Sequence, residues 1–323
     1  MNEPILEMKN ISKNFGSVIA LKNVNLEVYP GEIRGLIGEN GSGKSTISSI
    51  AAGMQKASAG EMMFKGKKWE PSSMIDALQN GIGMVVQESG TIAGVTVAEN
   101  MFLAELVQFK NKFGLISKNK MNQKATEAMK AIGVSNVTGD MNMMTLDFQT
   151  RKLVEIAKVI MKNPEILVID ETSTALSQDG REIMYKLIRK FRDNGKAVIF
   201  ISHDLEEIME VCDTLTVLRD GTLIRTFQKE EFDADKIRTS MIGRELQGDY
   251  YRSDFTPSSQ TETALTANNL KYREELKSVD LVLKKGEIVG VGGLSSCGMH
   301  ALGKALFGGL ELEEGEVKTA DGC

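Results

Sequence analysis

A run of nine residues carries glycines, a lysine and hydroxyl side chains at the spacing that a phosphate-binding loop requires. It consists of Gly38, Glu39, Asn40, Gly41, Ser42, Gly43, Lys44, Ser45 and Thr46. Glycines let the backbone N–H groups curl around a phosphate, because they accept positive φ and carry no Cβ. In such a loop Lys44 supplies charge to the β- and γ-phosphates, and Ser45 offers a hydroxyl to Mg²⁺. The run therefore predicts a site for nucleotide phosphates and a metal ion.

Two acids follow a short apolar run elsewhere in the chain. Ile166–Ile169 indicates a buried strand that leads into Asp170 and Glu171. If that strand ends at the carboxyl edge of the sheet beside the phosphate loop, Asp170 can hold Mg²⁺ through water. Glu171 is then placed to orient or deprotonate an attacking water molecule.

Three further side chains, those of His203, Gln87 and Phe15, are candidates for the same site. His203 follows the apolar run Ala197–Ile201, and Gln87 ends the run in "GMVVQE". A lone histidine at a strand end is usually a cap or a core residue. Beside Asp170, however, His203 could hydrogen-bond the γ-phosphate and the water, and Gln87 could reach Mg²⁺. Phe15 is either a core residue or an aromatic ring that lies on adenine.

Strands and helices alternate in a pattern that positions these residues. Apolar β-branched runs at Ile33–Ile37, Ile166–Ile169 and Ala197–Ile201 are interspersed with helical spacing, including a helix from Lys44. This alternation is typical of an α/β fold with a largely parallel sheet. The pair Asp220-Gly221 between two further apolar runs predicts a hairpin. We therefore expect a P-loop NTPase fold with a RecA-like core and an antiparallel portion near the N-terminus.

The pattern becomes helical between the first and second halves of this core. We expect a helical subdomain over residues 92–150 within a first domain that spans residues 1–246. Met129, Met141, Met143 and Met144 lie in this region. They could form a soft docking surface, although methionines at helical spacing more often fill a core.

The chain then begins to repeat itself. Residues 247–264 include a stretch rich in Ser, Thr and Pro, which predicts a linker. The sequence from Leu276 echoes that from Leu21, so residues 265–323 are expected to be the opening part of a second domain that is cut short. In this copy Met299 and His300 stand where Lys44 and Ser45 stand in the first. The second phosphate loop is therefore expected to be inert.

Composition limits the kinds of partner. The net charge of −5 shows no basic excess, so nucleic acid is a poor first expectation. Three cysteines and two histidines fit neither a disulfide framework nor a histidine-rich metal site. No apolar run approaches the ~20 residues of a membrane helix, so a role in a membrane process would require docking onto chains that span the bilayer.

Several strings in this order resemble the ABC ATPase family, and within it the twin-domain ATPases of sugar importers. They are "GENGSGKST", "VVQE", "TVAENMFL", "VEIAKVIMKNPEILVIDE", "ISHDLEEIMEVCD" and "VLRDG". The resemblance implies an ATPase at the cytoplasmic face of the cell membrane. It would use ATP and Mg²⁺ to drive import of a simple sugar through permease subunits and a solute-binding protein. It also implies that Phe15 stacks on adenine, that Gln87 is the coupling glutamine and that His203 is the switch histidine.

The chain departs from the family pattern in places that matter. Where the family has a Leu-Ser-x-Gly-Gln signature, this chain has Leu146, Asp147, Phe148, Gln149 and Thr150, and Thr172 replaces the usual proline after Glu171. In the family two domains meet head to tail, with each nucleotide between one phosphate loop and the opposite signature. The altered signature and the altered second loop would then share one inert site, which leaves one working site built on Lys44.

Two other functions remain open at this point. The chain could be a soluble ABC ATPase of translation or repair, although it lacks a long basic linker between domains. It could also be a module that binds ATP without turning it over, because the opposing signature is absent from the sequence.

Overall fold

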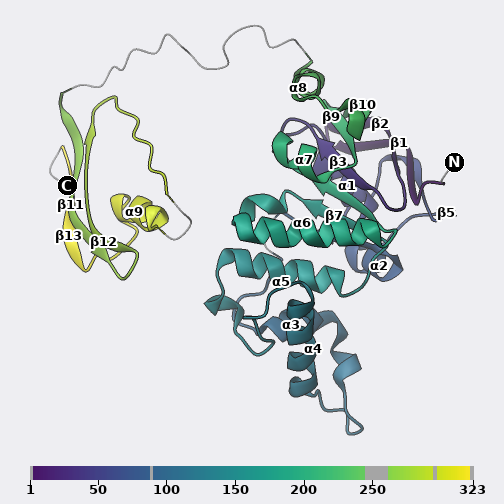
Figure 1. Ribbon diagram of the computed structural model, residues 1–323, viewed down its shortest axis with the longest axis horizontal. Coiled ribbons are helices and arrows are strands. Elements are labelled where there is room, and N and C mark those ends of the chain that lie inside the picture. The colour runs from purple at the N-terminus through teal and green to yellow at the C-terminus, as the bar shows by residue number, and fades with distance from the viewer. Residues whose placement is uncertain (1–2, 88–89, 244–260, 294–296, 321–323) are drawn as a thin grey trace. The chain divides into compact units, whose positions relative to one another are not determined.

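The computed structural model describes residues 3–87, 90–243, 261–293 and 297–320. The chain divides into two compact units, Met1–Leu246 and Gln247–Cys323 (Figure 1). Each unit has its own hydrophobic core, and each is described by itself below.

The first unit begins with an antiparallel sheet in the order β2-β1-β4-β5. Its strands are β1 (Leu6–Phe15), β2 (Val18–Val28), β4 (Ala59–Phe64) and β5 (Lys67–Lys68). Trp69 follows β5, packs against Phe64 with ring centroids 4.9 Å apart, and donates its indole N–H to the Ala51 carbonyl. The antiparallel portion that the sequence predicted near the N-terminus is thus present.

A six-stranded sheet in the order β10-β9-β3-β8-β7-β6 forms the centre of this unit. All neighbouring strands run parallel except β10, which pairs antiparallel with β9. Every residue of β3, β6, β7 and β8 is buried, as apolar runs without alternation indicate. The strands are β3 (Ile33–Ile37), β6 (Ile82–Val85), β7 (Ile166–Asp170), β8 (Ala197–Ile201), β9 (Thr214–Arg219) and β10 (Thr222–Gln228).

Helices cover both faces of the central sheet. On one face α1 (Lys44–Ala51) shares a core with the antiparallel sheet, through side chains that include Ile47 and Leu6. On the other face the core includes side chains of α5 (Phe148–Ile160) and α6 (Gln178–Asp193). The remaining elements around the sheet are α2 (Met74–Asn80), η3 (Thr172–Ala175), α7 (Leu205–Val211), η4 (Lys229–Glu231) and α8 (Ala234–Ile242). The predicted α/β fold and the predicted hairpin at Asp220-Gly221 are confirmed.

A helical region lies below the central sheet in Figure 1. It contains α3 (Val97–Phe102), η1 (Leu103–Phe109), α4 (Lys118–Ala131), η2 (Met143–Thr145) and α5 (Phe148–Ile160). The end expected near residue 150 falls within α5, whose helix continues for ten more residues. Of the four methionines, Met129 and Met143 are buried core residues, whereas Met141 and Met144 are exposed.

The second unit is a smaller version of the beginning of the first. Its sheet has the order β12-β11-β13, and one helix packs against it. The elements are β11 (Thr263–Tyr272), β12 (Leu276–Lys284), α9 (Met299–Leu306) and β13 (Glu314–Thr319). Thr263 already belongs to β11, so the linker expected over 247–264 ends earlier, and residues 247–260 of that stretch lie outside the described residues.

Candidate functional site

The predicted phosphate loop connects β3 to α1, in the strand–loop–helix context that such a loop needs. Gly41 and Gly43 have φ of 81° and 103°, which other residues rarely adopt. A Cβ on Gly38 would lie 2.1 Å from the Leu218 carbonyl oxygen. Gly38 therefore has no room for a side chain, whereas Gly41 and Gly43 adopt backbone conformations that favour glycine.

The loop contains two buried polar groups, the Lys44 ammonium and the Ser42 hydroxyl. Lys44 is buried, and its ammonium donates to the carbonyls of Gly38 (2.8 Å) and Glu39 (3.0 Å). Burial lowers the pKa of Lys44, because no anion neutralises the charge directly, although Glu171 and Asp170 raise it from farther away. The Ser42 hydroxyl is only 4% exposed and has no hydrogen-bond partner among the described residues. An orphaned hydroxyl and a desolvated ammonium fit a bound polyphosphate, which would satisfy both.

Asp170 ends β7 next to the start of α1. Ser45 donates its hydroxyl to the Asp170 carboxylate over 3.2 Å. Burial raises the pKa of Asp170, the hydrogen bond from Ser45 lowers it, and the neighbouring Glu171 raises it again. A hydroxyl and a buried carboxylate at this distance are a donor set that fits Mg²⁺.

Gln87, Glu171 and His203 meet at the same edge of the sheet. The Gln87 amide donates to the Glu171 carboxylate over 3.0 Å, and the His203 Nδ1 lies 3.9 Å from the same oxygen. Glu171 adopts φ of 42°, a strained conformation for a residue with a side chain. The structure thus brings together three residues that come from the ends of β6, β7 and β8 in the sequence.

Phe15 and Thr46 lie at the margins of the site. Phe15 ends β1 with 46% of its surface exposed, so the alternative that it is a core residue is wrong. The Lys13 ammonium lies 5.0 Å from the centroid of its ring. Thr46 is half-buried in the first turn of α1, while Glu39 and Asn40 are exposed on the loop.

A buried ion pair that the sequence analysis missed holds the segment around Gln87. Lys152 donates to the carbonyls of Val86 (3.0 Å) and Gln87 (3.3 Å) and pairs with Glu155 at 2.8 Å. Glu155 in turn accepts the backbone N–H of Gly90 over 2.6 Å. Both side chains belong to α5, so this helix forms hydrogen bonds to the backbone before and after residues 88–89. The spacing of a lysine and a glutamate three residues apart was the available signal, but it is common on helix surfaces.

A second missed residue is the buried carboxylate of Glu207 on α7. It accepts hydrogen bonds from Ser173 (2.8 Å), Ser202 (2.5 Å) and Tyr185 (2.5 Å). Ser173 lies two residues after Glu171, and Ser202 directly precedes His203. The network therefore ties together the two loops that carry Glu171 and His203. It also raises the pKa of Tyr185, chiefly through burial and then through the hydrogen bond to Glu207.

The segment at the position of the family signature serves the chain's own structure. The Asp147 carboxylate caps α5 by accepting the Thr150 N–H over 2.7 Å. The Gln149 side chain accepts the Ser177 N–H over 2.6 Å and so contacts the loop before α6. Thr172, in place of the usual proline, is buried and donates its hydroxyl to the Asp170 carbonyl.

The second copy of the loop has a different setting. Gly298 has φ of 88° and begins α9, in the same way that Gly43 begins α1. Residues 287–293, however, form no strand, and Ile288 is 95% exposed. Residues 294–296 of this loop lie outside the described residues, while Met299 and His300 stand at the first turn of α9.

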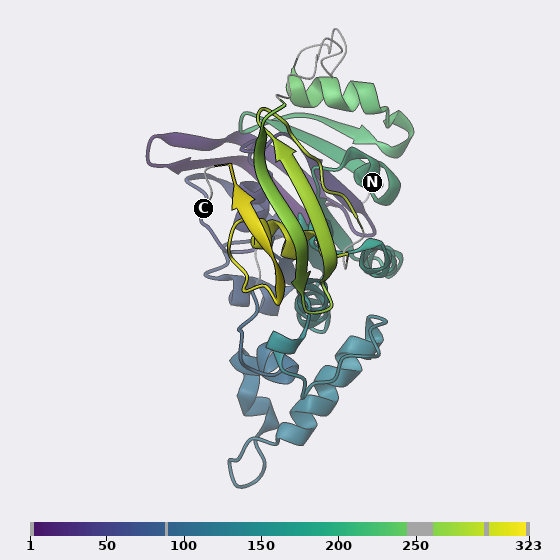
Figure 2. The same ribbon diagram turned by 90° about the vertical axis from the view of Figure 1, so that its left-hand side faces the viewer.

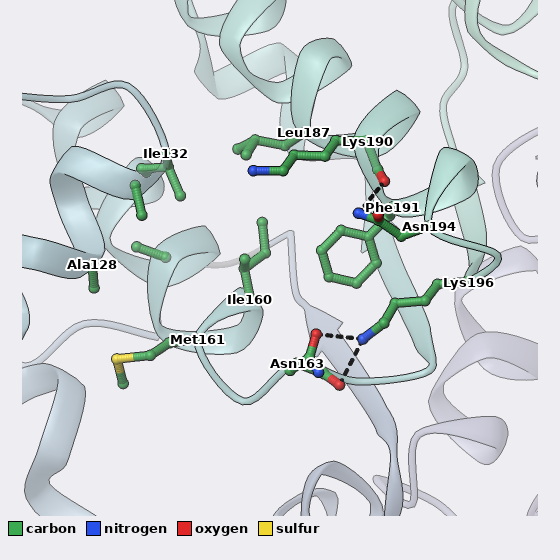
Figure 3. A pocket seen from close by; sticks show the side chains of 12 residues that line it. Ala128, Ile132, Ile160, Met161, Asn163, Leu187, Lys190, Phe191, Asn194 and Lys196 are labelled. Atoms are coloured by element: carbon green, nitrogen blue, oxygen red, sulfur yellow. Dashed lines mark hydrogen bonds between the residues drawn. The ribbon is translucent and has the colours of Figure 1, made fainter.

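An apolar cavity of about 280 Å³ lies elsewhere, where α4, α5 and α6 meet (Figure 3). Ile132, Ile160, Leu187 and Phe191 form its walls, and Lys196 at its edge is bonded to Asn163. None of the residues predicted to bind nucleotide lines it. The chemistry of the chain therefore centres on the polar edge of the sheet.

A parallel sheet with a glycine loop before α1, and with acid, amide and imidazole side chains along its carboxyl edge, defines a P-loop nucleotide-binding protein. Residues 21–174 match the family described as ABC transporter. Residues 21–174 therefore form a domain of this family.

Relatives and solved structures agree with this assignment. The chain is 36% identical over 315 residues to the ribose import ATP-binding protein RbsA of Caldanaerobacter subterraneus subsp. tengcongensis, and this covers 98% of the chain and 62% of that protein. It is also 36% identical over 316 residues to ribose import ATP-binding protein RbsA 2 of Escherichia coli O157:H7, which covers 98% of the chain and 61% of that protein. The chain thus spans less than two thirds of the length of these relatives.

Among solved structures, the chain resembles the ADP conformation of MJ1267, an ATP-binding cassette of an ABC transporter. The TM-score is 0.63 at 26% identity, with 75% of this chain and 99% of that one covered. The dimeric structure of MJ0796, a bacterial ABC transporter cassette, gives a TM-score of 0.61 at 27% identity over 70% of this chain and all of that one.

Proposed function

We propose that the chain binds Mg²⁺ and ATP through the loop at Gly38–Thr46 and couples ATP hydrolysis to the import of a simple sugar such as ribose. The observation that carries this proposal is the orphaned Ser42 hydroxyl beside the buried Lys44 ammonium, in a loop that is already folded. A polyphosphate supplies the hydrogen-bond acceptor that the Ser42 hydroxyl lacks and a negative charge for the Lys44 ammonium. The names of the relatives, which are ribose import ATP-binding proteins, support the sugar.

Each residue has a role that follows from its position. Lys44 binds the β- and γ-phosphates once it releases the carbonyls of Gly38 and Glu39, since an anion is a better partner for a desolvated ammonium. The loop N–H groups and the N-terminus of α1 stabilise the same negative charge. Phe15, exposed at the end of β1, is available to stack on adenine.

The hydrolytic part of the proposal rests on the residues around Glu171. Ser45, Asp170 and Gln87 would hold Mg²⁺, which neutralises phosphate charge when it is bound. Glu171 orients the attacking water and accepts its proton. His203, close to the same carboxylate, donates a hydrogen bond to the γ-phosphate. Gln87 bonded to Glu171 keeps that carboxylate in place before nucleotide arrives.

The proposed partners follow from the family. Membrane permease subunits and a solute-binding protein would select the sugar, and a second ABC domain would complete the nucleotide site from the opposite side. Among the described residues, no helix is long and apolar enough to cross a bilayer, so these partners would supply the membrane path. The proposed place of action is the cytoplasmic face of the membrane.

Calorimetric titration of ATP tests the nucleotide site directly. With Mg²⁺ present we expect one ATP per chain, and with a chelator we expect weaker binding. Asp170→Asn should abolish the difference between the two conditions, whereas Asp235→Asn, on the exposed surface of α8, should leave it intact. Binding that ignores Mg²⁺ in the unaltered chain would contradict the metal assignment.

Affinity purification of the tagged chain from its native cells tests the partners. Recovery of membrane permease subunits supports the import function. Recovery of ribosomal proteins in their place would show that the chain acts in translation.

A further inference from the structure

The connection between η1 and α4 forms a tight, ordered turn over residues 110–117. It projects from the helical region at the bottom of both views in Figures 1 and 2. Lys110 and Ile116 form a bridge across it, and the Asn111 N–H donates to the Leu115 carbonyl over 2.8 Å. The Asn111 side chain accepts the N–H groups of Phe113 (2.9 Å) and Leu115 (3.0 Å). The shape of the turn is therefore fixed by its own hydrogen bonds.

The base of the turn is anchored in the core. Phe109 is buried and packs edge-on against Phe102 with ring centroids 4.7 Å apart. The Lys124 ammonium lies 5.5 Å and 5.6 Å from the centroids of these two rings. The Ser117 N–H donates to the Phe109 carbonyl and closes the base. These contacts therefore fix the base of the turn to the core of the helical region.

The tip of this turn displays large apolar side chains to solvent. Phe113 is 89% exposed and Leu115 is also exposed, as is Val107 in the preceding η1. Leaving such side chains in water forgoes the favourable free energy of burying them. Exposed apolar side chains on an ordered turn indicate a surface that binds an apolar partner.

The same segment is the most basic part of the helical region. Five lysines and no acid lie between Glu105 and Glu127, in a chain whose net charge is −5. Lys110, Lys112, Lys118 and Lys120 are all exposed around the apolar tip. The nearby acids are engaged with other groups: Glu105 pairs with Lys162, Glu127 accepts from Gln123, and Glu99 caps α3 with Lys118 at 3.8 Å. The segment therefore combines exposed apolar side chains with exposed lysines.

We propose that residues 107–120 form a contact surface for the anionic headgroups and acyl boundary of a lipid bilayer. Exposed lysines close in sequence to an exposed phenylalanine and leucine match an interface that is negative outside and apolar beneath. Nucleic acid would use the lysines but would leave three aliphatic and aromatic side chains in water. This inference goes beyond the proposed ATPase activity and does not depend on nucleotide.

Co-sedimentation with vesicles tests the surface on the full chain without nucleotide. We expect binding to vesicles of phosphatidylglycerol and phosphatidylcholine and much weaker binding to phosphatidylcholine alone. Phe113→Ser should lower the partition coefficient about tenfold, since one buried phenylalanine is lost. Lys110→Glu with Lys112→Glu should lower it by at least about tenfold. Salt at about 1 M, where the Debye length is about 3 Å, should also release the chain.

Matched variants on other surfaces provide the controls. Phe307 is 92% exposed in the second unit, so Phe307→Ser removes a comparable apolar ring elsewhere. Lys67→Glu with Lys68→Glu reverses two exposed charges on β5. Both controls should bind vesicles like the unaltered chain. Equal losses in Phe113→Ser and Phe307→Ser would overturn the proposal.

An assay with double-stranded DNA tests the alternative that the lysines bind nucleic acid. Retention on DNA that depends on Lys110 and Lys112 but not on Phe113, without vesicle binding, would overturn the lipid proposal in favour of nucleic acid. Neither result would alter the ATP titration, so a failed lipid surface and a failed nucleotide site are distinguishable. Circular dichroism of each variant verifies that it has folded.

Discussion

The two repeats of this chain preserve the same frame around two very different loops. β13 and β4 are six residues each, and α9 and α1 are eight residues each. Both sheets place the first strand of the unit between its second strand and the strand that follows the helix. Asn10 and Asn269 both have positive φ, and each donates its N–H to a side chain on the next strand. Such agreement in irregular details indicates that the frame follows from local sequence that both copies keep.

The difference lies in the strand that presents the loop. In the first unit β3 is fully buried between β8 and β9, and it delivers Gly38 to the carboxyl edge of a six-stranded sheet. In the second unit residues 287–293 have no strand neighbours and form no strand. We therefore expect that a glycine loop and a helix are not sufficient for a phosphate site, because the parallel sheet must fix the loop and bring acids to its edge.

The largest contrast is expected between Ile33 and Ile288, which occupy the same position in the two copies. Ile33→Ala should lower the free energy of unfolding by about 2–5 kcal/mol, because it opens a cavity beneath the central sheet. Ile288→Ala should change it by less than about 0.5 kcal/mol, because the side chain is in water. Urea denaturation measures both. A large effect of Ile288→Ala would show that residues 287–293 are packed.

The next contrast concerns the residues at the start of the two helices. Lys44→Ala should weaken ATP binding by about 1.5–3 kcal/mol, the range for a hydrogen bond to a charged group. Met299→Ala should leave the affinity unchanged. Calorimetric titration compares the two, and equal affinities for Lys44→Ala and the unaltered chain would refute the assignment of the first loop.

The positive φ of Gly298, which the second loop shares with Gly43 of the first, can be tested by itself. A Cβ on Gly298 would lie 2.1 Å from the Glu275 carbonyl oxygen, at φ of 88°. Gly298→Ala should therefore destabilise the second unit by about 1–3 kcal/mol. Gly303 lies within α9 with open space at its Cβ position, so Gly303→Ala should stabilise it by about 0.5–1 kcal/mol. Hydrogen exchange of α9 distinguishes the two, and protection that rises in both variants would contradict the strain.

The burial of the Asp170 carboxylate beside the first loop should lower the stability of the nucleotide-free chain. The pKa of Asp170 is higher in the folded than in the unfolded chain, mainly through burial, so folding loses stability as pH rises above the usual value near 3.8. Asp170→Asn should therefore stabilise the nucleotide-free chain at pH 7 by about 0.5–2 kcal/mol. The gain should shrink as the pH falls toward that value. Thermal unfolding at several pH values measures it, and a gain that grows toward acid pH would contradict the sign.

The smallest effect is expected from an attempt to restore the second loop. Met299→Lys should leave the number of ATP molecules at one per chain, because His300 offers no hydroxyl and residues 287–293 form no strand to present the loop. Adding His300→Ser should not change this result. A titration that reaches two ATP molecules per chain would show that the sheet is dispensable.

The sequence predicted the parts of the fold that are determined by short-range patterns. Buried strands such as β3 and β8, the hairpin at Asp220 and the glycine loop were recognisable because apolar runs and turn residues act locally. The duplication was also visible, since both copies keep the same glycines. The roles assigned to Gln87, Glu171 and His203 stay predictions, although the structure brings the side chains of Gln87 and His203 to within 4 Å of the Glu171 carboxylate.

What could not be predicted depends on contacts between distant segments. Lys152 holds carbonyls that lie more than sixty residues before it, and Glu207 accepts hydrogen bonds from three separate elements. A lysine or glutamate on a helix gives no sign of such a partner. The exposure of Phe15 depends in the same way on which surfaces the rest of the chain leaves uncovered.

The place of Trp69 gives the molecule an intrinsic optical probe. It is the only tryptophan of the chain, and it is buried in the first unit with its indole bonded to the last residue of α1. Tryptophan emission therefore reports on that unit alone, whereas the second unit is silent at the same wavelength. Because α1 runs from the phosphate loop to this indole, a change in emission when ATP is added would be a signal from the loop at the other end of the helix.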